Sequence, residues 1–403
     1  MSDGNIDCVI VGGGIGGAVL ALALGRLGHR VVVLEREPAP PPTVRPEILA
    51  TATIDVFHQL GVGDRIRAEA ALPLRGLELR QAGDGRLLGF SQEEFRRAGV
   101  QPHSTDPGLT RRVLLEEAAG CVEVRRGIEV REVVREGGRV VGVRGVRDGQ
   151  PVEVRARLVI GDDGGRSRIR EGLGIPLAVT EFPIDFLGAA GSAGGWAEAA
   201  VGQAWLNPSG LRDGLFAGLF LPLPGARVAM VFGMTPASYE RFRQRGPETF
   251  QTAAARLAPG ATDLIRSHAF PDGFAHIRRP FGHAPRYVAD GAALLGDAVH
   301  PVTPVGGQGA NMSVADAAAL AAVAHEALRS GDCSAKRLSA YETSRRAAND
   351  RSLQFSVRAT RIVGLLAAVP WAAGVLAWWL RWVERSPQTK TRFLRSVSSA
   401  FRS

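Results

Sequence analysis

The pattern of hydrophobic residues predicts a strand, a helix and a second strand at the start of the chain. Residues 6–11 form a short apolar run rich in β-branched side chains, which is typical of a buried strand. Residues 18–27 favour a helix that ends at Gly28, and residues 30–34 form another apolar run that leads to Glu35. This order predicts a βαβ unit, the building block of a parallel sheet covered by helices.

The middle of the chain shows a helical segment and then short strands. Residues 48–60 have the pattern of a helix that ends at Gly61. Apolar and polar residues then alternate in four runs, at 122–125, 128–136, 139–147 and 152–158. The turn sequences Gly137-Gly138 and Asp148-Gly149-Gln150 separate them and are typical of hairpins. We therefore expect an antiparallel meander inserted into a parallel sheet.

The second half of the chain is expected to form another sheet and then return to the first one. Residues 172–280 are richer in glycine, proline and aromatic residues. Residues 292–295 read as a buried strand, and an alanine-rich helix is expected from Gly309 to about Arg329. Two intertwined domains are the expectation for a chain of 403 residues.

A glycine-rich loop lies between the first strand and the first helix, with the pattern Gly12-x-Gly14-x-x-Gly17. In such a loop the glycines allow a tight turn, the approach of a pyrophosphate to the backbone and close packing of helix on strand. The helix N-terminus faces the phosphate charge, and an acid such as Glu35 accepts hydrogen bonds from the adenosine ribose. The loop predicts dinucleotide binding but does not separate FAD from NAD.

Two further segments carry a resemblance to a known family. Residues 161–170 (GDDGGRSRIR) follow a predicted strand, and residues 296–311 (GDAVHPVTPVGGQGAN) link a strand to a helix. With the glycine-rich loop, they resemble the motifs GxGxxG, DG and GDxxHxxxPxxGxGxN of the class A flavoprotein monooxygenases, the family of p-hydroxybenzoate hydroxylase. The three motifs occur in the family's order and extend from Gly12 to Asn311.

The resemblance implies roles for individual residues. Pro304 matches the proline whose backbone carbonyl lies near flavin N5, and Asp297 matches the acid that binds the ribityl chain. His300 matches a position that is commonly structural, and a catalytic role is the less favoured alternative. The implied FAD-binding residues are Gly12, Gly14, Ile15, Gly16, Gly17, Glu35, Arg36, Arg45, Arg111, Asp163, Gly164, Asp297, Gly307, Gly309, Ala310 and Asn311.

At a few positions the match to the family pattern is ambiguous or incomplete. Arg112 matches the family arginine that opens the helix nearly as well as Arg111 does. Asp162 stands where the family usually has a small residue. For Arg45 and Arg111, a solvated surface arginine is the alternative.

The resemblance implies an α/β fold with a Rossmann-like FAD-binding domain (GR2-type), an inserted antiparallel substrate domain and C-terminal helices. The FAD-binding domain is expected in three parts, residues 1–75, 101–171 and 283–350. Residues 76–100 and 172–282 would form the substrate domain, and residues 351–403 a helical segment.

The implied activity is that of a monooxygenase. NADH or NADPH reduces FAD, O2 adds to give a flavin C4a-hydroperoxide, and an electron-rich aromatic substrate is hydroxylated or epoxidised. A lipophilic substrate such as an alkylated or prenylated phenol, quinone or quinolone of secondary metabolism is expected. His268, His276 and His283 have no metal-ligand spacing, so no metal is predicted.

The charge and the cysteine content indicate which partners and which cellular compartment to expect. The net charge is +9, but the basic residues are nearly all arginines spread along the chain, so a nucleic-acid partner is not expected. Cys8, Cys121 and Cys333 are widely spaced and fit a reducing compartment. No signal peptide is read at the N-terminus, so we expect a cytoplasmic protein.

Residues 362–380 (IVGLLAAVPWAAGVLAWWL) contain no charge. Pro370 favours two short helices with a break. Three interpretations of this segment remain open. They are a buried or substrate-capping segment, peripheral contact of residues 362–382 with the inner face of the membrane, and a membrane span. The first two indicate a lipophilic substrate.

Other functions are compatible with the same fold. Flavin halogenases need a catalytic lysine, whereas the only lysines here are Lys336 and Lys390. An FAD-dependent prenyl-lipid reductase remains the alternative enzyme, and a non-catalytic flavin-fold binding protein is the alternative from another class.

Overall fold

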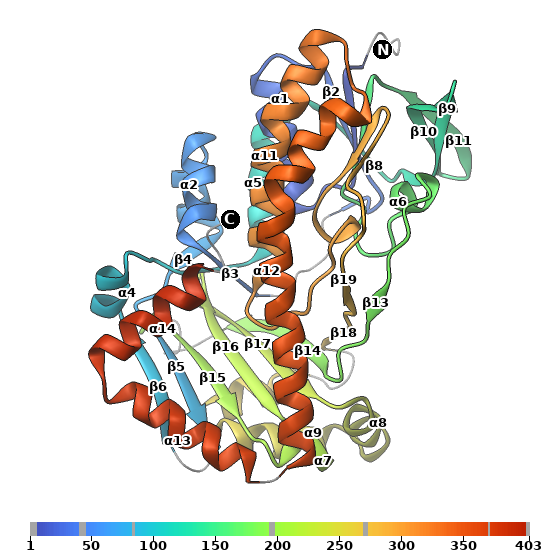
Figure 1. Cartoon of the computed structure of the whole chain (residues 1–403). Helices are drawn as coiled ribbons and strands as arrows, with labels where there is room; N and C mark the ends of the chain where they lie inside the picture. Colours follow the sequence, from blue (N-terminus) through green and yellow to red (C-terminus); the bar gives the residue numbers. More distant parts are fainter. Residues whose placement is uncertain are drawn as a thin grey trace.

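Two β-sheets, each covered by helices, organise the described part of the chain, which in this computed structural model comprises residues 6–39, 46–82, 85–192, 198–268, 273–369 and 371–399. One sheet lies above the other in Figure 1, and a long helix passes beside both. The predicted fold class, with a Rossmann-like domain, a second sheet domain and C-terminal helices, is confirmed.

The first sheet has six strands, and all neighbours except the β20–β21 pair run parallel. In spatial order they are β20 (Val288–Ala289), β21 (Ala292–Leu294), β12 (Leu158–Gly161), β1 (Cys8–Val11), β2 (Val31–Glu35) and β8 (Glu123–Arg126). Every residue of β1, β2 and β12 is buried, as expected for strands covered on both faces. The run at 122–125, expected in the meander, is instead β8 and lies at the edge of this parallel sheet.

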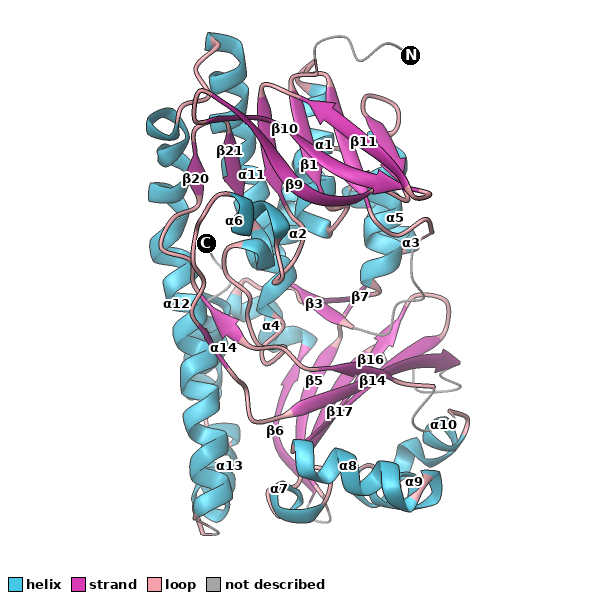
Figure 2. Cartoon of the chain, turned by 90° about the vertical axis from the view of Figure 1, so that its right-hand side faces the viewer, coloured by secondary structure: helices cyan, strands magenta, loops and turns pink. Residues whose placement is uncertain are grey.

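Helices and a small sheet cover the two faces of the six-stranded sheet (Figure 2). The helices are α1 (Ile15–Arg26), α5 (Pro107–Ala118) and α11 (Gln308–Ser330). The opposite face is covered by the predicted meander, β9 (Glu129–Glu136), β10 (Arg139–Arg147) and β11 (Gln150–Arg155). The two predicted hairpin turns are confirmed, and Gly137, Gly138, Asp148 and Gly149 in them have positive φ angles.

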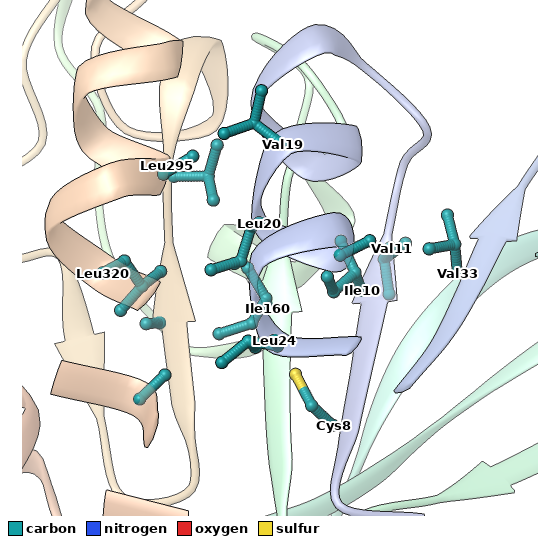
Figure 3. Packing of buried hydrophobic residues seen from close by; sticks show 14 of the residues in the cluster. Cys8, Ile10, Val11, Val19, Leu20, Leu24, Val33, Ile160, Leu295 and Leu320 are labelled. Atoms are coloured by element: carbon teal, nitrogen blue, oxygen red, sulfur yellow. The ribbon is translucent and has the colours of Figure 1, made fainter. Parts of the chain in front are cut away.

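Apolar side chains between α1, α11 and the sheet form the core of this domain. Figure 3 shows Leu20 and Leu24 of α1 close to Ile160 of β12, with Leu320 of α11 beside them. All four side chains are fully buried, which stabilises the domain by roughly 1.5–3 kcal/mol for each. This packing fixes the position of the α1 N-terminus relative to the ends of β1 and β12.

The second sheet has seven strands, of which only β15 and β5 pair in parallel. In spatial order they are β18 (Ala275–Ile277), β14 (Asp185–Ser192), β17 (Arg227–Met234), β16 (Ala217–Leu223), β15 (Val201–Leu206), β5 (Gly76–Gln81) and β6 (Gly85–Ser91). Helices α8 (Pro236–Arg245), α9 (Pro247–Leu257) and α10 (Thr262–Arg266) lie on the face away from the first sheet (Figure 2). The core between these helices and the sheet contains Phe220, Phe232 and Phe250, and the ring of Phe232 contacts the other two rings.

Shorter elements connect the two sheets. A two-stranded ribbon pairs β13 (Val179–Thr180) with β19 (Phe281–Gly282), and a three-stranded sheet consists of β3 (Glu47–Leu49), β7 (His103–Thr105) and β4 (Ala71–Pro73). The remaining helices are α2 (Thr51–Gln59), α3 (Gly63–Glu69), α4 (Gln92–Ala98), α6 (Arg168–Gly172) and α7 (Gly210–Asp213).

The helix predicted at 48–60 is wrong at its start. Residues Glu47–Leu49 form strand β3, and the helix α2 begins only at Thr51. The reason is a ladder to β7, in which Ile48 pairs with Ser104 more than fifty residues along the chain. A short apolar run does not by itself distinguish a strand from the first turn of a helix.

The C-terminal part consists of α12 (Ala335–Ala368), α13 (Ala372–Glu384) and α14 (Pro387–Ser399). Helix α12 contacts α11 and β20 at one end and α7 and α13 toward the other, and α13 packs on β6 (Figure 1). The predicted break falls between α12 and α13, while Pro370 itself lies outside the described residues. No helix in the described residues has the length and apolar character needed to cross a membrane.

Candidate active site

Three loops from distant parts of the chain meet at the carboxyl ends of neighbouring strands. Gly12 follows β1, Asp162 follows β12 and Gly296 follows β21. The Gly17 N–H, in the first turn of α1, donates a hydrogen bond of 2.8 Å to Asp162 Oδ2. The carboxyl edge of an open parallel sheet is where such folds bind ligands.

The glycine-rich loop is too closely packed for side chains. Gly12 has a φ of +103°, and a Cβ there would lie 2.3 Å from the Asp162 carbonyl oxygen. A Cβ on Gly17 would lie 2.5 Å from the Gly12 carbonyl oxygen and 2.8 Å from Asp162 Oδ2. The loop, with Gly14 as N-cap and with Ile15 and Gly16 in the first helical turn, leaves the start of α1 without a side-chain cap or an acid of its own.

Glu35 is held firmly at the end of β2. Its Oε2 accepts a hydrogen bond from Gly13 N at 3.0 Å, and its Oε1 accepts one from Glu37 N at 2.9 Å. The neighbouring Arg36 side chain is mostly exposed and pairs with Glu37. Arg45, the other predicted arginine of this region, lies outside the described residues.

The two acids after β12, Asp162 and Asp163, bind different parts of the structure. Asp162 is partly buried, and desolvation of its carboxylate raises its pKa well above the ordinary value; the Gly17 N–H opposes this shift, whereas Asp297 and Asp163 add to it. Asp163 binds the start of α6 through Ser167 Oγ and through Arg168 N at 2.7 Å. Burial also raises the pKa of Asp163, and Gly164 follows with a φ of +81°.

Asp297 forms an ion pair with Arg279, whose side chain reaches it from the segment between β18 and β19. Both side chains are partly exposed. Arg279 is not predicted from the sequence, because it belongs to no motif and meets Asp297 only through the fold.

The loop before α11 is held by backbone and amide hydrogen bonds. Pro304 O accepts one from Gly307 N at 3.1 Å, and Gly307 is the left-handed N-cap of α11 with a φ of 64°. Asn311 Nδ2 donates to Ile48 O, and its Oδ1 accepts from Ala50 N, both at 2.8 Å. Asn311 therefore ties the start of α11, where Gly309 and Ala310 lie, to the β3–α2 segment.

His300 is buried and points at Asp316 of α11. Its Nε2 lies 2.5 Å from Asp316 Oδ2, Arg345 Nε of α12 donates to Asp316 Oδ1 at 2.9 Å, and Gly296 N donates to Oδ2 at 3.3 Å. Burial alone would raise the Asp316 pKa, but His300 and Arg345 outweigh it and lower the pKa to about 2. Neither Asp316 nor Arg345 is predicted from the sequence, because both lie in helical stretches without a motif.

Beside this network, a cavity of about 330 Å³ lies between β19 and α12. His283 Nδ1 on its wall is 2.7 Å from Asp350 Oδ1, and its Nε2 contacts the Tyr287 hydroxyl at 2.5 Å. Asn349 Nδ2 links that hydroxyl, at 3.1 Å, to Asp316 Oδ1, at 3.0 Å. A chain of hydrogen bonds therefore runs from the cavity to the aspartate that holds the 296–300 loop.

These features define a dinucleotide-binding flavoprotein of the two-domain type. Residues 5–356 match the family model described as an FAD binding domain, and the chain belongs to this family of class A FAD-dependent monooxygenases. Its cofactor is FAD. The residues fit this group, because the starts of α1 and α11 have neither a side-chain cap nor an acid in their first turns, and the buried Gln308 Oε1 at the start of α11 has no hydrogen-bond partner within the described residues.

Comparisons with known proteins agree with this assignment. The chain is 30% identical over 372 residues to 6-methylpretetramide 4-monooxygenase of Streptomyces rimosus, covering 89% of this chain and 84% of that protein. It is 28% identical over 339 residues to 3-demethoxyubiquinol 3-hydroxylase of Escherichia coli (strain K12), covering 79% and 80%.

Solved structures show the same fold. The crystal structure of P. aeruginosa PqsL in complex with 2-aminobenzoylacetate superposes with a TM-score of 0.76 at 26% identity, over 92% of this chain and 99% of PqsL. Klebsiella pneumoniae HpxO complexed with FAD and uric acid superposes with a TM-score of 0.77 at 22% identity, over 99% of this chain and 98% of HpxO. Because the sequence identity is low, this likeness shows the fold alone.

The close packing at Gly17 predicts a loss of FAD in the variant Gly17→Ala. The added methyl group would overlap the Gly12 carbonyl oxygen and the Asp162 carboxylate, at a cost of about 1–3 kcal/mol. The FAD-to-protein absorbance ratio of the purified protein measures the effect. Gly364→Ala is the control, because a Cβ at Gly364 meets nothing within 4 Å. Full FAD content in Gly17→Ala would contradict the packing argument.

The buried Asp316 predicts a large loss of stability in Asp316→Asn. The variant leaves His300 and Arg345 buried without their anionic partner, and such a change costs about 3–5 kcal/mol. Urea unfolding at neutral pH measures it, and Asp64→Asn, which breaks only an exposed pair with Arg67, is the control. Because the pKa of Asp316 is lowered in the folded state, its contribution should be complete above about pH 4 and decline toward pH 2. Equal free energies of unfolding for the two variants would contradict this role of Asp316.

Proposed function

We propose that the chain is an NAD(P)H-dependent monooxygenase that inserts one oxygen atom of O2 into a lipophilic aromatic substrate. In the balanced reaction, substrate, O2, NADH or NADPH and a proton give hydroxylated substrate, water and oxidised nicotinamide; an epoxide is the alternative product. The observation that carries the proposal is the meeting of the loops at Gly12, Asp162 and Gly296, joined by the Gly17–Asp162 hydrogen bond. FAD, when bound there, supplies electron transfer from the nicotinamide and activation of O2.

The protein's contribution in this proposal is to bind and orient the cofactor. Glu35, held by the Gly13 N–H, would accept hydrogen bonds from the ribose hydroxyls, and the start of α1 would face the pyrophosphate. Asp297 would bind the ribityl hydroxyls, with Arg279 balancing its charge. The start of α11, which has neither a side-chain cap nor an acid in its first turn, would stabilise negative charge on the reduced ring.

Two loop residues have different proposed roles. Pro304 would present its backbone carbonyl toward the reacting edge of the ring, as the family resemblance implies. His300 is committed to Asp316 inside the protein, so we assign it the positioning of the 296–304 loop instead of a catalytic step.

The lipophilic substrate is supported by the side chains around the 296–311 loop. Val302 and Val305 of this loop share an apolar cluster with Phe186 of β14, with Phe216 just before β16 and with Leu353 of α12. Phe186, Phe216 and Val305 are only partly buried. A ring that enters between the loop and the sheet would therefore meet apolar walls and would displace water from them. Alkylated or prenylated phenols, quinones and quinolones are the substrate classes to test.

The choice between Arg111 and Arg112 leads to a prediction about FAD affinity. Arg112 pairs with Glu69 at 2.9 Å and Glu116 at 3.8 Å, whereas Arg111 has no ion pair or hydrogen bond among the described residues. We propose that Arg111 binds the FAD pyrophosphate. Arg111→Gln should weaken FAD binding by about tenfold or more, since a charge-assisted hydrogen bond contributes about 1.5–3 kcal/mol. Titration of the apoprotein with FAD measures this, and Arg112→Gln is the matched control. The reverse order of affinities would assign the role to Arg112.

The reaction itself is tested with labelled oxygen. The purified FAD-loaded protein is incubated with NADH or NADPH, each candidate substrate and ¹⁸O2. A monooxygenase should consume O2 only when substrate is present and should transfer one labelled atom to the product, as mass spectrometry would show. Substrate-dependent oxidation of NAD(P)H without O2 uptake, with two hydrogens added to the substrate, would instead identify a prenyl-lipid reductase.

A further inference from the structure

The exposed apolar side chains of this protein are concentrated on its C-terminal helices. Nine large apolar side chains are exposed in the described residues, and all except Leu27 and Val179 lie between residues 362 and 382. They are Ile362, Leu365, Trp371, Val375, Trp378, Trp379 and Trp382. Single exposed apolar residues are ordinary, but such a concentration indicates a surface that contacts something apolar.

Helix α13 is divided lengthwise into two apolar faces. Ala377, Leu380 and Val383 are buried against Leu87 and Leu88 of β6, which holds the helix on the second sheet. Trp371, Val375, Trp378 and Trp382 follow one another at helical spacing on the other side and are 50–72% exposed. The packing of α13 is therefore complete without these side chains.

Arginines border the exposed apolar residues on both helices. Arg358 and Arg361 lie about one turn before Ile362 and Leu365 on α12, and Arg385 lies three residues after Trp382. These three arginines are exposed, and none has an acidic partner in the described part of the chain. We name the set of seven apolar side chains and these three arginines the tryptophan face.

The tryptophan face has no compensating negative charge. Glu384 is the only acidic residue between positions 351 and 403. It is turned inward, where it accepts hydrogen bonds from Arg86 at 2.8 Å and Gly89 N at 3.0 Å and pairs with Lys390 at 3.1 Å. The outward charge of this region is therefore entirely positive.

From this arrangement we propose that the tryptophan face docks the protein on the surface of an anionic lipid bilayer. Indole rings favour the interfacial zone of a bilayer, and arginines beside them attract anionic head groups. Helix α13 has 13 residues and is about 20 Å long, shorter than the roughly 30 Å hydrocarbon layer, so it lies along the surface. A helix that lies on a protein surface and exposes an apolar face flanked by cations binds membranes in this way.

Charge also argues against a second copy of the chain as the occupant. Two copies meeting face to face would bring the same unpaired arginines together, with no acid on either side to balance them. An anionic bilayer supplies both the apolar layer and the negative charge that this face lacks. The proposal extends the proposed function, because a bilayer would deliver a lipophilic substrate, but vesicle binding requires no substrate or turnover and is therefore tested separately.

Sedimentation with lipid vesicles tests the docking. The FAD-loaded full chain should bind vesicles of phosphatidylcholine mixed with phosphatidylglycerol, and it should bind phosphatidylcholine alone more weakly. The double variant Trp378→Ser/Trp382→Ser should lose about tenfold or more in binding to the mixed vesicles, because two interfacial anchors are removed. Arg358→Gln/Arg361→Gln should lose about fivefold for each charge on mixed vesicles and little on phosphatidylcholine.

Matched controls separate this surface from a general effect of apolar exposure. Val179→Ser removes an exposed apolar residue outside this surface, on β13, and should bind as the unchanged protein does. All variants should keep their FAD content and thermal stability, since the altered side chains are exposed. Brominated lipids should quench tryptophan fluorescence in the unchanged protein, and less in the tryptophan double variant.

Several results would overturn the proposal. One is the absence of vesicle binding by the unchanged protein, and another is full binding by the tryptophan variant. A third is a dimer in sedimentation velocity that the tryptophan variant converts to a monomer, without vesicle binding, which would make a second copy the occupant of this face.

Discussion

The hydrogen bond from Gly17 N to Asp162 Oδ2 joins two loops that are 145 residues apart, and the proposed cofactor site is built around it. It forms only because Gly12 and Gly17 have no side chains, so that the loop after β12 can lie directly against the loop after β1. The fully buried Leu20, Leu24 and Ile160 hold α1 at this height on the sheet. The packing of the core therefore also determines how these two loops are arranged.

Asp316 performs a comparable function at the other end of the site. It joins the 296–300 loop, α11 and α12 through Gly296, His300 and Arg345, all within a part of the core that water does not reach. A buried carboxylate is costly unless it is paired, and here the pairing is good enough to lower the pKa of Asp316 to about 2. The loop proposed to face the flavin is thus anchored by charge, whereas the glycine-rich loop is fixed by close packing.

The long helix α12 connects the two halves of the molecule. Its first part carries Arg345 and Asn349 into the buried network, and its later part contributes Leu353, Val363 and Leu366 to the apolar cluster beside the second sheet. The helix therefore connects the network that holds the 296–300 loop to the apolar cluster beside the second sheet, and it ends at the tryptophan face. Binding at that face would place β6, on which α13 packs, close to a lipid surface.

Local sequence patterns determined much of this protein. The βαβ start, the two hairpin turns, the α11 helix and the break between α12 and α13 follow from periodicity, glycine and proline, which act within a few residues. The three motifs are local as well, and they are sufficient to indicate the family. Strand β3 could not be predicted in this way, because its partner β7 lies far along the chain and neither short run has a decisive pattern of its own.

Only the tertiary structure decided which polar side chains pair. Neighbouring arginines 111 and 112 look alike in the sequence, and the fold alone places Glu69 beside Arg112. In the same way it brings Arg279 to Asp297 and Arg345 to Asp316. Periodicity specifies which face of an element is apolar, because burial is a property of each residue. An ion pair depends on the relative position of two elements, and that position is fixed only when the whole core has packed.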